Sequence, residues 1–105
     1  MACFDFFKRR NIAKEVSFRY TVQDVFSIKG RGLVVVGMVE KGSVQVGDVL
    51  TLTRPDNSFM EVIVGGLELY GQGLVQSATA GENVGIFLKS DITKDDVAKG
   101  DVLTK

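Results

Sequence analysis

The carboxylates of this chain are its most evident candidates for chemistry, and Asp91, Asp95 and Asp96 form the densest group. Oxygen ligands at this spacing could hold a magnesium ion weakly. Asp95 and Asp96 also stand where a short helical turn is predicted over residues 93–99, and acidic side chains there complement the positive end of the helix dipole. Because this second explanation is sufficient, we expect no metal site and no cofactor.

The sequence contains few residues that could act as a catalytic acid, base or nucleophile. Asp24, Glu61 and Glu82 belong to different predicted strands, and nothing in the sequence brings two of them together as an acid–base pair. The 105 residues include no histidine and one cysteine, Cys3, so internal disulfides, zinc fingers and histidine catalysis are excluded. Cys3 is either a reactive thiol or, as we favour, a residue without a chemical role. We therefore expect a protein that is not an enzyme.

The 12 glycines suggest a phosphate-binding loop, and Gly30-Arg31-Gly32 is the obvious place for it. A P-loop requires Gly-Lys-[Ser/Thr] at its end, and no such tripeptide occurs in the chain. The dinucleotide fingerprint G-x-G-x-x-G would require glycine where the chain has Val35. The glycines are interpreted as turn formers, and these residues contain no GTPase machinery.

Short strands are the elements that would position these groups. Alternating apolar residues, with Phe18 and Tyr20 on the core side, predict a strand from Val16, and the alternation slips at Gln23-Asp24 as it does at a β-bulge. Gly65-Gly66 predicts a second bulge within a strand over residues 59–69. The remaining strands are predicted over residues 33–39, 48–53, 74–79, 83–88 and 102–103.

Six or seven short strands with glycines at their bends indicate an all-β fold, a small closed antiparallel barrel. A length of 105 residues suits one core, and a composition of 45% hydrophobic and 25% charged residues is typical of a globular chain. No apolar run approaches the roughly 18 residues of a membrane-spanning helix, and nothing resembles a signal peptide. We expect a cytoplasmic protein, with the barrel at residues 15–105.

The first 14 residues differ from this barrel and form a separate arm. An apolar group precedes a basic one, in the order Phe4, Phe6, Phe7, Lys8, Arg9 and Arg10. This order suits a short amphipathic helix on an acidic membrane or a partner, although a frayed arm whose phenylalanines pack on the domain is the interpretation we favour. Residues 1–20 carry a net charge of +3 within a neutral chain, which leaves −3 for the rest. The barrel therefore exerts no strong field on nucleic acid.

Four segments in consistent order resemble the second domain of elongation factor Tu and related translational GTPases. They are DVFSIKGRGLVVVG at 24–37, VEKGSVQVGD at 39–48, AGENVG at 80–85 and DDVAKGDVL at 95–103. The resemblance extends over about residues 16–105 and implies the small antiparallel barrel that the residue pattern also predicts.

In elongation factor Tu this barrel packs against the GTP-binding domain and helps to hold the aminoacylated 3′ end of transfer RNA, with a pocket for the terminal adenosine and its amino acid. The resemblance implies that the binding residues here are Asp24, Phe26, Ile28, Val34, Asn83 and Phe87. The chain departs from the family at four places. Gln23 stands where the factor has glutamate, Val36 where it has threonine, Phe87 where an aliphatic residue is usual, and Lys89-Ser90 where it has Arg-Gly.

The resemblance implies a stand-alone, non-enzymatic module that contacts transfer RNA, the ribosome or a translation factor. A GTPase would then act in trans. The alternative is a protein-interaction adaptor, held at a membrane surface by the Phe4 to Arg10 run of the arm.

Overall fold

The computed structural model describes residues 17–28, 32–89, 92–93 and 95–105. The arm predicted at residues 1–14, including Cys3 and the membrane-contact run, lies outside the described residues and stays a prediction. The predicted turn at Gly30-Arg31 lies outside them as well.

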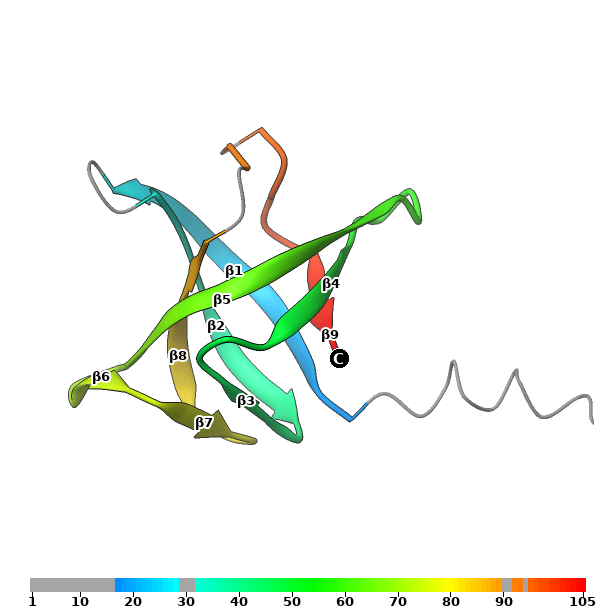
Figure 1. Ribbon diagram of the computed structural model, residues 1–105. Helices are drawn as coiled ribbons and strands as arrows, with labels where there is room; N and C mark the ends of the chain where they lie inside the picture. Colours follow the sequence, from blue (N-terminus) through cyan, green and yellow to red (C-terminus); the bar gives the residue numbers. More distant parts are fainter. Residues whose placement is uncertain (1–16, 29–31, 90–91, 94) are drawn as a thin grey trace, which may run out of the picture.

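The described residues form nine strands. They are β1 (Arg19–Ile28), β2 (Gly32–Lys41), β3 (Ser43–Gln45), β4 (Val49–Thr53), β5 (Phe59–Leu69), β6 (Gly73–Val75), β7 (Ser77–Thr79), β8 (Asn83–Leu88) and β9 (Val102–Thr104). Six of them pair in the order β4-β9-β1-β2-β8-β5, and β4 also pairs with β5, which closes an antiparallel barrel (Figure 1). β6 is an extra strand on β5, and β3 pairs with β7. The predicted all-β barrel is confirmed.

Both predicted bulges are present. The register of β1 against β2 shifts between Val22 and Asp24, and that of β5 against β8 shifts between Val64 and Gly66. The first shift changes the phase of β1, so that Val22 and Val25 are both buried while Asp24 and the alternate residues after it are exposed. It therefore places the predicted site residues of β1 on the outside of the barrel.

The barrel interior is apolar, and Tyr20 supplies its main polar link. Phe18 and Tyr20 are fully buried, as their alternation predicts, with ring centroids 6.3 Å apart. The Tyr20 hydroxyl donates to the carbonyl oxygen of Val84 at 2.7 Å and lies 3.3 Å from that of Val35. One side chain of β1 thus links β2 and β8 through the core.

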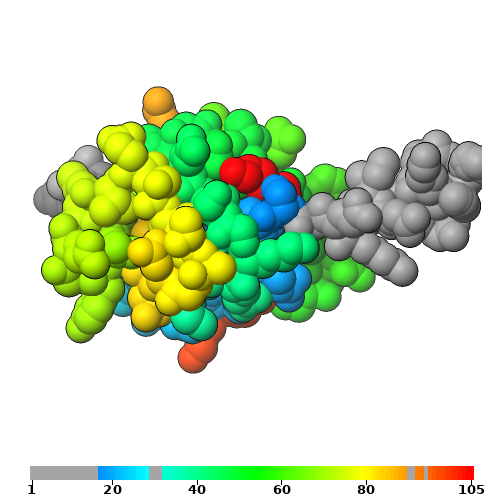
Figure 2. Space-filling view, turned by 90° about the horizontal axis from the view of Figure 1, so that it is seen from below, coloured from blue at the N-terminus to red at the C-terminus, as the bar shows by residue number. Residues whose placement is uncertain are grey.

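The two ends of the described chain lie side by side. The amide of Ser17 donates to the carbonyl oxygen of Lys105 at 2.9 Å, and Figure 2 shows the last residues at the surface next to the first described ones. Lys105 Nζ forms an ion pair with Asp48 Oδ2 at 2.7 Å at the start of β4. β9 itself pairs with β1 and β4, so the C-terminal strand completes the barrel.

The helical turn predicted over residues 93–99 is wrong. The described part of the chain contains no helix, and consequently none able to cross a membrane. Two turns occupy this segment, with hydrogen bonds from the amide of Asp96 to Thr93 and from that of Asp101 to Ala98. The Asp96 and Asp101 carboxylates accept from the amides of Thr93 and Ala98, each at 2.9 Å. Each of these side chains caps a single turn, and Val97, which lies between the two aspartates in the sequence, is buried in the core.

Candidate ligand pocket on the outer face of the barrel

A pocket of about 470 Å³ lies on the outer face of β1, β2, β5 and β8. It is lined by Phe26, Ile28, Val34, Val36, Glu68, Leu69, Tyr70, Gly71, Asn83, Val84 and Gly85. Of the residues that the resemblance implies, the pocket brings together Phe26, Ile28, Val34 and Asn83. These residues come from three different strands, so only the closed sheet makes them neighbours.

The register of the strands explains why the surface is hollow at this point. Val36 of β2 pairs with Gly85 of β8, and Gly85 pairs with Glu68 of β5. Gly85 has no side chain, so a gap opens between its two neighbours. A Cβ added to Gly85 would lie 3.6 Å from Val34 Cγ1, which is an ordinary contact. Glycine at this position is therefore needed for the depth of the pocket rather than for the fold.

Two exposed aromatic side chains are part of the pocket wall. Phe26 is 49% exposed and Tyr70 is 87% exposed. The Tyr70 amide donates to the carbonyl oxygen of Asn83 at 3.2 Å, which fixes the end of β5 beside the start of β8. Glu68 and Asn83 contribute polar side chains, and no basic side chain of the described residues lines the pocket. The arrangement suits a planar, largely apolar ligand group that carries hydrogen-bonding substituents.

Asp24 and Phe87 do not line this pocket. Asp24 is exposed, and its Oδ1 accepts a hydrogen bond from the amide of Val25 at 2.8 Å. Phe87 instead lines a second depression of about 260 Å³, together with Gly65, Leu88 and Lys89. The structure therefore divides the predicted site into one pocket and two neighbouring positions on the outer surface.

The other carboxylates that the sequence singled out have structural surroundings. Glu82 Oε1 accepts from the amide of Thr79 at 2.8 Å and stabilises the turn before β8. Glu61 is exposed on β5 and faces Thr51 of β4 in the register. In the described ranges, no three histidine, cysteine, aspartate or glutamate side chains are grouped as metal ligands would be.

Several pocket residues had not been identified from the sequence. Val84 and Gly85 belong to the AGENVG segment, which could have identified them. Glu68, Leu69, Tyr70 and Gly71 have no comparable signal, because they enter the site only where β5 pairs with β8.

Comparison with solved structures relates the fold of this chain to a translation factor. No family model matches the chain. The structure is similar to part of the apo form of translation elongation factor SelB from Methanococcus maripaludis, with 33% sequence identity and a TM-score of 0.73. The match covers 84% of this chain and 18% of the SelB chain, so this chain corresponds to a small part of that factor.

Proposed function

Because the chain folds as a β-barrel of the translation elongation factor type, we propose that it is a non-enzymatic binding module that takes the aminoacylated 3′ end of transfer RNA in its outer pocket. The observation that supports this proposal is the convergence of Phe26, Ile28, Val34 and Asn83 on one pocket. These four are among the residues that the sequence resemblance implies for binding.

The chemistry of the pocket suits a nucleoside with an attached amino acid. The exposed rings of Phe26 and Tyr70 offer surfaces on which adenine can stack, an interaction that contributes about 1–3 kcal/mol per base. Ile28 and Val34 provide apolar contact, and Glu68 and Asn83 provide hydrogen-bonding groups for the ribose hydroxyls and the amino group.

The charge of the pocket favours an end of the RNA over its backbone. Among the described residues that line the pocket, Glu68 is the charged one, and its charge is negative. A phosphate backbone lying across the pocket would therefore find no attractive charge there. A terminal nucleoside has no phosphate on its 3′ side and fits this environment. The described residues contain no helix and hence no P-loop GTPase fold, so the barrel that we propose as the binding module does not itself hydrolyse GTP.

Filter binding of the full chain to aminoacylated and uncharged transfer RNA tests the proposal. We expect preference for the charged form, and Phe26→Ala should weaken binding about tenfold because one stacking surface is lost. Phe59→Ala is the matched control, since Phe59 is 71% exposed but does not line the pocket. Removal of residues 1–14 should leave RNA binding unchanged. The proposal is overturned if the chain binds neither RNA and also fails to co-sediment with ribosomes.

A further inference from the structure

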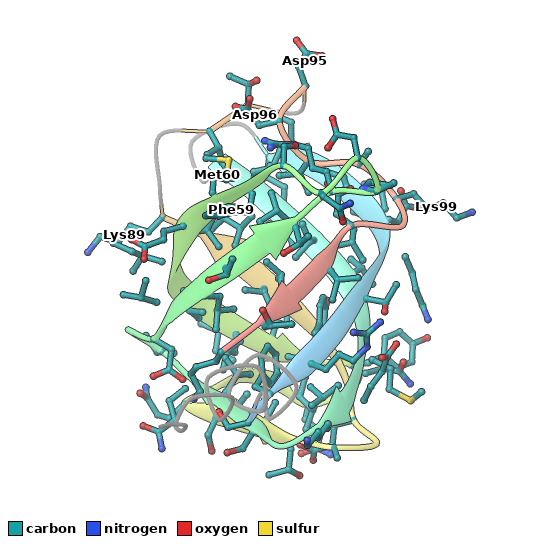
Figure 3. All side chains as sticks on the ribbon, turned by 90° about the vertical axis from the view of Figure 1, so that its right-hand side faces the viewer. Phe59, Met60, Lys89, Asp95, Asp96 and Lys99 are labelled. Carbon is teal, nitrogen blue, oxygen red and sulfur yellow. The ribbon has the colours of Figure 1, made fainter. Side chains whose placement is uncertain are left out.

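One outer face of the barrel is formed by β9, β4 and β5, which pair in this order (Figure 3). Alternate residues of these strands point outward, and we call the surface that they form the β4-β5-β9 face. It is defined by Val49, Thr51, Thr53, Phe59, Glu61 and Thr104. Phe59 is 71% exposed and Val49 is 51% exposed, and neither lines the pocket or the second depression. The face thus combines exposed apolar side chains with one carboxylate.

Glu61 gives the β4-β5-β9 face a negative charge. β4 and β9 contain no charged residue, and the two charged residues of β5 are Glu61 and Glu68. Lys105 and Arg19, the cations at the edge of the face, are already paired with carboxylates at 2.7 and 2.9 Å. Within the described ranges, no basic side chain forms an ion pair with Glu61. A segment with apolar and basic side chains is therefore complementary to this face.

The N-terminal arm joins the barrel beside this face. The amide and the hydroxyl of Ser17 both donate to the carbonyl oxygen of Lys105, at 2.9 and 3.0 Å, and Lys105 directly follows Thr104 of the face. Phe7 precedes Ser17 by 10 residues, a length that spans up to about 33 Å when extended and about 15 Å as a helix. The face extends over the length of β4, about 13 Å from its first residue to its last. The arm is therefore long enough to reach along it in either form.

We propose that the arm, residues 1–14, docks on the β4-β5-β9 face of its own barrel. The phenylalanines of the arm cover Val49 and Phe59, which removes apolar surface from water on both partners. The basic run at residues 8–10 pairs with Glu61. Residues 1–14 contain four basic side chains and one acidic one, so their net charge is opposite to that of the face. This inference does not depend on the function proposed for the pocket.

Docking of the arm leaves the pocket open. In the barrel order β4-β9-β1-β2-β8-β5, the strands β4 and β9 lie across the barrel from β2 and β8, which contribute to the pocket. The arm therefore does not compete with a ligand in the pocket, in agreement with the expectation that its removal leaves RNA binding unchanged. The same aromatic and basic side chains would be needed for contact with an acidic membrane, so a docked arm does not also hold the chain at a membrane surface.

The single cysteine of the chain makes a direct test possible, because Cys3 belongs to the arm. A nitroxide attached to Cys3 broadens the amide signals of nearby residues in NMR spectra of the isotope-labelled full chain. We expect strong broadening at Thr51 and Glu61 on the face, and little at Val34 and Gly85 on the pocket side of the barrel. The inference is overturned if the two pairs of residues broaden equally.

Two substitutions on the face should weaken docking. Glu61→Lys replaces the attraction for the basic run by repulsion and should lower the ratio of docked to undocked arm about fivefold, the upper range for one exposed ion pair. Phe59→Ala should lower this ratio as well, because less apolar surface is covered. Glu68→Lys is the matched control, since it makes the same change of charge on the same strand outside the face, and it should leave the broadening at Thr51 unchanged. Full broadening in both face variants, or an equal loss in the control, would contradict the inference.

A mixed sample separates docking within one chain from docking between two copies. It contains isotope-labelled chain without the nitroxide and unlabelled chain that carries it. We expect no broadening at Thr51 in this mixture. Broadening as strong as in the spin-labelled chain itself would assign the arm to the face of a second copy and overturn the inference.

Discussion

Replacing Tyr20 by phenylalanine would remove one hydroxyl from the centre of the barrel and leave the ring in place. Tyr20 is fully buried, and its hydroxyl donates to Val84 at 2.7 Å while lying 3.3 Å from the carbonyl oxygen of Val35. Phenylalanine has the same shape, so the substitution creates no sizeable cavity. What it changes is the hydrogen bonding of two buried carbonyl groups on β2 and β8.

The expected magnitude follows from this geometry. Leaving a buried acceptor without its donor costs about 1–3 kcal/mol. We expect Tyr20→Phe to lower the free energy of unfolding by about 2 kcal/mol, which corresponds to a fall in melting temperature of about 8–16 °C for a domain of this size.

Thermal and urea unfolding followed by circular dichroism measure this loss. Tyr70→Phe is the matched control, because Tyr70 is 87% exposed and its substitution should leave the stability unchanged. If Tyr20→Phe unfolds within about 0.5 kcal/mol of the wild-type chain, the range of ordinary surface substitutions, the hydroxyl does not stabilise the barrel and the reasoning is refuted.

The dependence on pH supplies an independent check on Tyr20. Burial raises the pKa of the Tyr20 hydroxyl well above its ordinary value of 10.0, so folding favours the protonated form. The stability associated with this group is complete below about pH 10 and is lost as the pH rises further. The wild-type chain should therefore lose more stability than Tyr20→Phe between about pH 10 and 12, and equal losses would contradict this assignment.

Three further substitutions test other parts of the structure. Gly37→Ala should destabilise the barrel by about 3 kcal/mol in urea unfolding, because the new Cβ would collide with the carbonyl oxygen of Thr21; wild-type stability would contradict this. Gly85→Ala should fold normally but bind charged transfer RNA about tenfold more weakly in filter binding, since its methyl group fills the pocket; unchanged affinity would count against the site. A hydrogen bond from Lys105 is the main cause of the lowered pKa of Asp48, so Lys105→Met should raise that pKa toward its ordinary value in an NMR titration. The contribution of Asp48 to stability is present above about pH 4 and is lost as the pH falls through the lowered pKa; a titration midpoint that does not move would show that the ion pair is not its cause.

Much of the fold can be predicted from neighbouring residues. The alternation through Phe18 and Tyr20 identified a strand and its buried face, and the phase slip at Gln23-Asp24 identified the bulge. These features depend on a few consecutive residues, and local sterics and side-chain alternation are sufficient to specify them. The helical turn over residues 93–99 was predicted from the same kind of local signal and is wrong, because the segment forms two separate turns, closed by the carboxylates of Asp96 and Asp101.

The sequence by itself determined an all-β barrel of the translation-factor type and named Phe26 and Asn83 as members of one site. Only the tertiary structure brought Tyr70 to that site and placed Phe87 in a neighbouring depression beside Lys89. The physical reason is that these positions depend on the register between β5 and β8, which the glycine bulge shifts by one residue. Such a register results from closing the whole barrel around its core, and no short stretch of sequence encodes it.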